Sequence, residues 1–172
     1  MEIQLTRIPE AQKPVLRQLL EFYCYDFSEF IYLELDEEGY FNYPYLDHYW
    51  IEEDRHPFFI LRDNVIVGFV LVNRHGFIQK KEEGYTMAEF FVMRGHRRRG
   101  IGIQAAHLAF DLFPGKWEVA QQLSNQASVH FWDDCISTYL NGLETVKVVF
   151  LQEKMKRVML FSTHDRQAIE KV

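Results

Sequence analysis

The sequence predicts a mixed α/β fold that is organised as one domain over residues 1–172. At 172 residues the chain has the length of a single domain, and no Pro/Gly/Ser-rich linker divides it. Apolar residues make up 48% and charged residues 26%, which is the composition of a globular protein. Strand patterns alternate with helical patterns in the middle of the chain and hairpin patterns flank them, as in a mixed sheet covered by helices.

The first half of the chain is expected to contain three strands and a long helix. Ile3–Arg7 alternates weakly and predicts a strand, and apolar residues recur on one face of a helix from Pro14 to about Phe27. Residues 31–53 are aromatic and acidic and contain turn residues, so we expect loops and a short helix there. Phe58–Leu61 and Val65–Asn73 flank a turn that Asp and Asn favour, and they predict a β-hairpin.

In the second half we expect four alternating elements and a closing pair of strands. In chain order these are a strand over Met87–Met93, a helix over Ile101–Leu112, a strand over Trp117–Gln121, a helix over Gln126–Tyr139, and strands over Thr145–Leu151 and Arg157–Ser162.

Charge is unevenly distributed along the chain. The net charge of −6 argues against a general nucleic-acid binder, because such proteins neutralise phosphates with basic residues. No Lys or Arg lies between Arg17 and Arg55, where acidic residues accumulate, whereas four arginines fall within residues 94–99. One acidic and one basic region in a small domain indicate two ligands of opposite charge.

The sequence predicts a cytoplasmic protein without a metal. The N-terminus lacks a basic segment followed by an apolar run, and no stretch is long and apolar enough to cross a membrane. Cys24 and Cys135 lie far apart without metal or redox spacing, which is typical of buried thiols in a reducing compartment. The seven histidines are scattered without a ligand pattern.

The segment after the strand at Met87–Met93 has the features of a pyrophosphate-binding turn. Arginines lead into Gly100-x-Gly102, and a helical pattern follows directly. N–H groups at a helix N-terminus are unpaired, the helix dipole adds positive charge, and glycine allows close approach to the main chain. The structural alternative is an ordinary turn with a solvated basic patch.

The residues of this turn resemble a family signature. Glu89-Phe-Phe-Val-Met-Arg-Gly-His-Arg97-Arg-Arg-Gly100-Ile-Gly102 is similar to the acetyl-CoA motif of the GNAT superfamily of N-acetyltransferases, Arg/Gln-x-x-Gly-x-Gly/Ala. The resemblance covers residues 87–112, and a second segment follows in which Asn125 and Phe131-Trp132 are similar to the family's Asn-containing turn and aromatic pair.

The resemblance implies a GNAT-like fold, with a central, mostly antiparallel twisted sheet of about six to seven strands flanked by about four helices. It also implies acetyl-CoA as cosubstrate, bound by a core over residues 87–140, and an acceptor side in the first half. The sequence leaves open whether two copies form a homodimer. The residues that the resemblance places against the coenzyme are Phe91, Val92 and Met93 for the pantetheine arm, Arg97, Arg98, Arg99, Gly100, Ile101 and Gly102 for the pyrophosphate, and Asn125 and Trp132 near the arm and sulfur.

Glu89 is the candidate general base. Strand alternation places it on the face of Phe91, and apolar neighbours raise the proton affinity of a carboxylate. A purely structural carboxylate is the alternative. Trp132 stands where the family often has a tyrosine that protonates the departing thiolate, and an indole N–H is no practical acid. Tyr139, two helical turns further on, or a water molecule could replace it.

These features predict an N-acetyltransferase that acts by direct attack in a ternary complex. Twelve aromatic residues fall between Phe22 and Trp50 among uncompensated carboxylates, so a small cationic amine or a basic peptide is expected as acceptor. A non-catalytic acetyl-CoA sensor is the main alternative. A dinucleotide-binding domain is a remote one, because Arg94–Arg99 separate the strand from the glycines and no acidic residue ends a strand near position 120.

Overall fold

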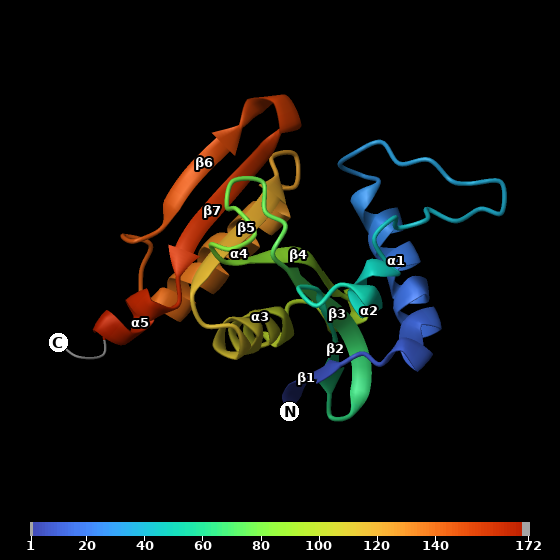
Figure 1. Ribbon diagram of the computed structural model, residues 1–172, viewed down its shortest axis with the longest axis horizontal. Coiled ribbons are helices and arrows are strands. Elements are labelled where there is room, and N and C mark those ends of the chain that lie inside the picture. Colours follow the sequence, from blue (N-terminus) through green and yellow to red (C-terminus); the bar gives the residue numbers. More distant parts are fainter. Residues whose placement is uncertain (1, 170–172) are drawn as a thin grey trace.

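The computed structural model describes residues 2–169, and a seven-stranded sheet forms its centre (Figure 1). The strand order is β1-β2-β3-β4-β5-β7-β6, and all neighbours are antiparallel except β4 and β5. The strands are β1 (Ile3–Arg7), β2 (His56–Arg62), β3 (Val65–Asn73), β4 (Tyr85–Val92), β5 (Lys116–Gln122), β6 (Lys147–Leu151) and β7 (Lys156–Ser162).

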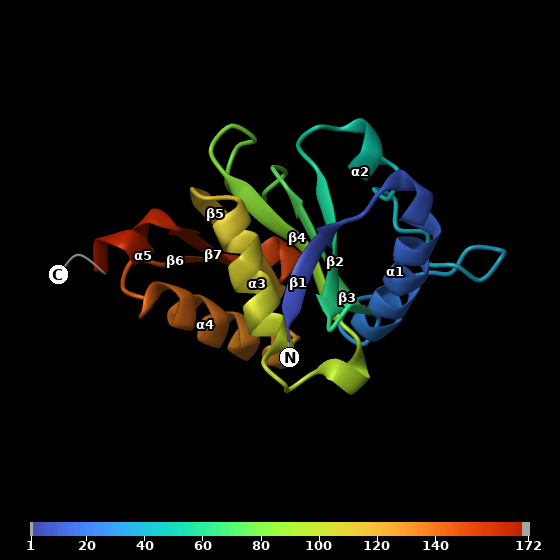
Figure 2. The same cartoon turned by 90° about the horizontal axis from the view of Figure 1, so that it is seen from below.

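Helices cover both faces of the sheet (Figure 2). One face carries α1 (Lys13–Phe27) and α2 (His48–Ile51), and the other carries α3 (Ile101–Leu112) and α4 (Gln126–Leu140). The predicted mixed α/β fold with a mostly antiparallel sheet is therefore confirmed. A fifth helix, α5 (His164–Ile169), follows β7 and was not expected from the sequence.

Each face has its own hydrophobic core. Leu16, Leu19 and Leu20 of α1 are buried at helical spacing and pack against the side chains of Phe69 and Phe91 from the sheet. On the other face, fully buried side chains from α3, β5 and α4 include Phe110, Trp117 and Ile136. The sheet is thus the middle layer of three, and its residues alternate between the two cores.

Strand β4 departs from simple alternation at one position. Leu71 lies opposite Glu89 and Val72 lies opposite Met87, so Ala88 is an extra residue in a β-bulge. Met87 consequently packs in the α3/α4 core, whereas Glu89 faces α1. The bulge therefore turns the Glu89 carboxylate to the face of the sheet that α1 covers.

The pairing between β4 and β5 is short. Tyr85, Thr86 and Met87 pair in parallel with Trp117, Glu118 and Val119, and no pairing continues beyond them. Within residues 2–169, the edge of β4 that faces β5 therefore pairs with no strand after Met87. Main-chain groups at this edge remain available to an extended ligand.

No helix within residues 2–169 has both the length and the apolar character that a membrane crossing requires. Cys24 and Cys135 are both buried free thiols, as the sequence predicts.

Candidate functional site

The turn between β4 and α3 presents unpaired amide groups. The left-handed backbone of Gly100, with φ 75°, redirects the chain into α3, and its carbonyl accepts the first helical bond from the Gln104 N–H at 3.1 Å. Within the described part of the chain, no acceptor pairs with the N–H groups of residues 100–103. These are the four donors that an α-helix leaves open at its start. The turn has the geometry that pyrophosphate binding requires.

The side chain of Arg97 is used inside the protein. Its Nε donates to the Val92 carbonyl at 2.6 Å, and its guanidinium pairs with Asp26 at 2.5 Å. Arg94 pairs with the same carboxylate at 2.7 Å. Partial burial raises the pKa of Asp26, but the two guanidinium groups outweigh it and hold that pKa below its usual value. Arg97 therefore fixes the shape of the turn, while the side chains of Arg98 and Arg99 are exposed.

Gly102 has a packing role in this structure. A Cβ at this position would lie 3.0 Å from the Phe131 ring and 3.6 Å from that of Phe90. The rings of Phe90 and Phe131 stack at 5.7 Å. The missing side chain thus allows α4 to approach the start of α3, a reason that the glycine pattern alone does not reveal.

The structure places the two predicted residues at the beginning of α4 in different roles. The Asn125 Oδ1 accepts the Ser128 N–H at 2.9 Å, so this side chain caps the helix and only its amide nitrogen is left for a ligand. Trp132 is only 5% exposed and packs edge-on against Phe90 at 5.2 Å. It supports the aromatic stack beside the turn.

Tyr139 lies on the α3/α4 side of the sheet. Its hydroxyl donates to Asp111 at 2.8 Å, and its ring packs against Phe110 at 5.1 Å. Burial, together with the Asp111 carboxylate, raises the pKa of Tyr139 to about 12. The structure does not bring this residue together with Glu89, which faces α1.

Two tyrosines hold the carboxylate of Glu89. The Tyr23 hydroxyl donates at 2.5 Å and the Tyr43 hydroxyl at 3.1 Å, one to each oxygen. Burial raises the pKa of Glu89 above its ordinary value, while both phenols and the Lys156 ammonium lower it. The sequence prediction of a raised proton affinity agrees with this direction. It missed Tyr23 and Tyr43 as partners, because both belong to a long aromatic segment in which no pattern singles them out.

A hollow of about 310 Å³ lies between α1 and the end of β4. It is lined by Phe22, Tyr25, Asp26, Phe91, Met93 and Arg94. The lining contains the Asp26–Arg94 ion pair beside the turn and the apolar side chains of Phe91 and Met93 at the end of β4. The two sequence segments expected to face the acceptor and the coenzyme therefore meet here.

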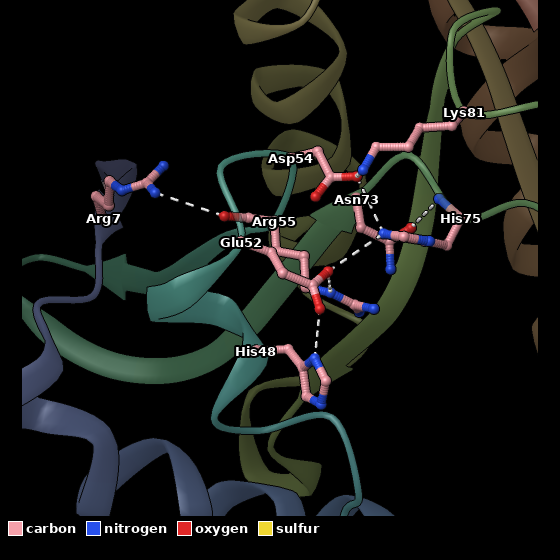
Figure 3. A network of polar contacts seen from close by, with 8 residues as sticks. All are labelled: Arg7, His48, Glu52, Asp54, Arg55, Asn73, His75 and Lys81. Atoms are coloured by element: carbon pink, nitrogen blue, oxygen red, sulfur yellow. Dashed lines mark hydrogen bonds and ion pairs between the residues drawn. The ribbon is translucent and has the colours of Figure 1, made fainter.

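Four of the acidic residues between Arg17 and Arg55 form ion pairs, so the expectation of uncompensated carboxylates does not hold for these four. Glu52 pairs with Arg55 at 2.7 Å, and Asp54 pairs with Lys81 at 2.8 Å and His75 at 3.0 Å (Figure 3). Asp47 similarly pairs with Lys13 at 2.9 Å. The compensating cations come from outside the acidic stretch or from its border, and a count along the sequence cannot find them.

The ion-pair network in Figure 3 also contains the one group of possible metal ligands within residues 2–169. Ligand atoms of Glu52, Asp54 and His75 lie within 4.8 Å of one another. Because Arg55 and Lys81 already neutralise the carboxylates, we interpret the group as an ion-pair network and assign no metal to it.

Comparison with known proteins identifies a family. The sequence model of the Acetyltransferase (GNAT) family matches residues 16–135, which include most of α1, the turn and most of α4. No curated protein sequence matches the chain.

Solved structures share the fold at low sequence identity. An acetyltransferase from Thermus thermophilus is 15% identical, with a TM-score of 0.69 over 94% of this chain and 97% of that one. Spermidine N-acetyltransferase from Vibrio cholerae, in complex with CoA and spermine, is 11% identical, with a TM-score of 0.64 over 96% and 98%. An aminoglycoside acetyltransferase with coenzyme A and kanamycin is 13% identical, with a TM-score of 0.66 over 99% of both chains.

Proposed function

Because the chain belongs to the acetyltransferase (GNAT) family, whose enzymes use acetyl-CoA, we propose that it transfers an acetyl group from acetyl-CoA to a primary amine in a ternary complex. The observation that carries this proposal is the set of open N–H groups at residues 100–103, which lie next to the strand that holds Glu89. The open N–H groups suit a diphosphate, and the Glu89 carboxylate suits an ammonium group.

The coenzyme is proposed to lie along residues 87–140. The amides at the start of α3 hold its pyrophosphate, and the exposed Arg98 and Arg99 add attraction. The edge of β4 that faces β5, with Phe91, Val92 and the following Met93, is proposed to line the pantetheine arm, and the Val92 carbonyl and the Met93 N–H are already engaged by the Arg97 Nε and the Val67 carbonyl. The acceptor is then proposed to bind on the α1 side of β4, so the first half of the chain contributes the acceptor site and residues 87–140 contribute the coenzyme site.

The proposed reaction uses Glu89 as the base. Its carboxylate takes one proton from the acceptor ammonium, and the neutral nitrogen attacks the carbonyl carbon of the thioester. A C–N bond forms and the C–S bond breaks, and the thiolate takes the second proton from the same nitrogen. No separate acid is needed in this sequence, which is consistent with Trp132 where the family often has a tyrosine.

The acceptor is proposed to be a small molecule or a basic peptide with a free ammonium group. The carboxylate of Glu89 and the rings of Tyr23 and Tyr43 surround the reacting position, and both kinds of group attract a cation. The buried free thiols of Cys24 and Cys135 suit a reducing compartment and support a cytoplasmic location.

Release of free thiol tests the proposal against the sensor alternative. With acetyl-CoA and a panel of primary amines, we expect thiol release that depends on both the protein and the amine, together with an acetylated product in the mass spectrum. A protein that binds acetyl-CoA but releases no thiol with any amine would instead be a sensor. The measurement uses a colorimetric thiol reagent after the reaction is quenched.

A further inference from the structure

Lys156 lies on the same face of the sheet as Glu89. Trp117 and Val119 of β5 point into the α3/α4 core, so Gln122, at an odd spacing from both, points to the α1 face. Lys156 of β7 lies directly opposite Gln122, and opposite residues share a face. Glu89 on β4 and Lys156 on β7 therefore lie on either side of β5, near the place where β4 and β5 have ceased to pair.

Within residues 2–169 the ammonium group of Lys156 has no ion pair within 4.0 Å. It stands 5.0 Å from the centre of the Phe77 ring, and the side chain is half-buried. Burial lowers the pKa of Lys156, whereas the charge of Glu89 raises it. A half-buried cation without a contacting anion is less stable than a paired one, so a negative group at this position would be favoured.

The two charges are close enough to influence each other and too far apart to form a contact. A ligand with a positive group at one end and a negative group at the other would neutralise both. Four other acidic residues of the first half, Asp26, Asp47, Glu52 and Asp54, are paired with the protein's own cations, so these four offer little attraction to a second ammonium group.

We propose that the acceptor is a small zwitterion, whose ammonium group binds at Glu89 and whose anionic oxygen group, a carboxylate or a phosphate, binds at Lys156. This inference rests on the proposed acetyl transfer and specifies its substrate class. It replaces the cationic acceptor expected from the sequence with one that has no net positive charge, because only the reacting group is positive. A second ammonium group, as in a diamine, would meet Lys156 and be repelled.

Three amines of equal chain length test the proposal. n-Pentylamine, 5-aminopentanoate and 1,5-diaminopentane present a neutral, a negative and a positive end to Lys156, and 4-aminobutyl phosphate distinguishes phosphate from carboxylate. We expect kcat/KM for the better anionic amine to exceed that for pentylamine by roughly tenfold, the size of one charge-assisted hydrogen bond, and diaminopentane to be the poorest. Equal values for all four amines would overturn the inference.

A charge reversal provides the second readout. Lys156→Glu is expected to invert the ranking, with diaminopentane becoming the best acceptor and the change appearing mainly in KM. Lys147→Glu on β6 makes the same charge change at an exposed position and is expected to leave the ranking as it is. If Lys156→Glu keeps the original ranking, or if Lys147→Glu changes it equally, Lys156 is not the determinant and the inference is wrong.

The failure of this inference can be separated from that of the proposed function. If all amines give thiol release with equal kcat/KM, the proposed acetyl transfer stands and only the proposal of a zwitterionic acceptor is overturned. Absence of thiol release with every amine overturns both. Heats of binding to the CoA-loaded protein check the same ranking without turnover, so a variant with weak activity still gives a decisive result.

Discussion

Burial and hydrogen bonding have opposite effects on the pKa of Glu89. Its half-buried position disfavours the charged form, and the hydrogen bonds from Tyr23 and Tyr43 restore part of the lost stabilisation. A carboxylate in this balance can accept a proton from an ammonium group more readily than an exposed one. The same phenols fix its orientation toward the α1 side.

Replacement of Glu89 tests its role as base. Glu89→Gln is expected to lower kcat/KM by roughly 100-fold or more, the usual contribution of a general base. In the unmodified protein, kcat/KM should rise with pH through the pKa of Glu89, above the ordinary value of 4.5, since only the carboxylate accepts a proton. Tyr23→Phe removes a hydrogen bond that lowers this pKa, so the acid limb should move to higher pH. The measurement is the pH profile of kcat/KM.

Tyr32→Phe provides the matched control for that series. Tyr32 also donates to a glutamate, Glu34, at 2.8 Å, but its side chain is 84% exposed. Its removal should leave the acid limb in place. If the limb persists unchanged in Glu89→Gln, another group is the base and Glu89 is structural.

At the scale of the elements, ion pairs connect the end of α1 to the turn before α3. Asp26 near the end of α1 holds Arg94 and Arg97, and Arg97 also holds the carbonyl of the last β4 residue, Val92. The acceptor side of the domain thus helps to position the amides proposed to bind the coenzyme.

Asp26→Asn tests this connection. We expect the Kd for CoA to rise roughly threefold to tenfold, about 1 kcal/mol, because the turn loses an ion pair that is only partly exposed. Asp47→Asn removes a similar pair with Lys13 at the other end of α1 and should leave the Kd unchanged. Calorimetric titration with CoA measures both. Equal affinities in the two variants would show that the pair does not shape the site.

The elements themselves could largely be predicted from the sequence, because long periodic runs such as Leu16 to Cys24 in α1 bury one face. The bulge at Ala88 could not, since it depends on the register with β3 and leaves no composition signal. Nor could α5, which has no strong apolar pattern. The motif around Gly100 was recognisable because the residues of a phosphate turn are local in sequence.

At the scale of the whole molecule, contacts between distant segments decide the charge of the site. Lys81 and Arg94 neutralise Asp54 and Asp26, which precede them by many positions, so part of the acidic segment carries less negative charge than its sequence predicts. The hydrogen bonds of Tyr23 and Tyr43 to Glu89 likewise join residues far apart in the chain. The coenzyme turn was predictable from the sequence, whereas the acceptor side required the fold.

The most direct test of the central claim follows the backbone amides during a titration with CoA. In proton–nitrogen correlation spectra of the labelled protein, we expect saturable binding with the largest shifts at residues 100–103, whose N–H groups have no acceptor within the described chain. CoA lacking its diphosphate should not produce these shifts. Saturable binding that leaves these amides unchanged, or no binding at all, would contradict the account.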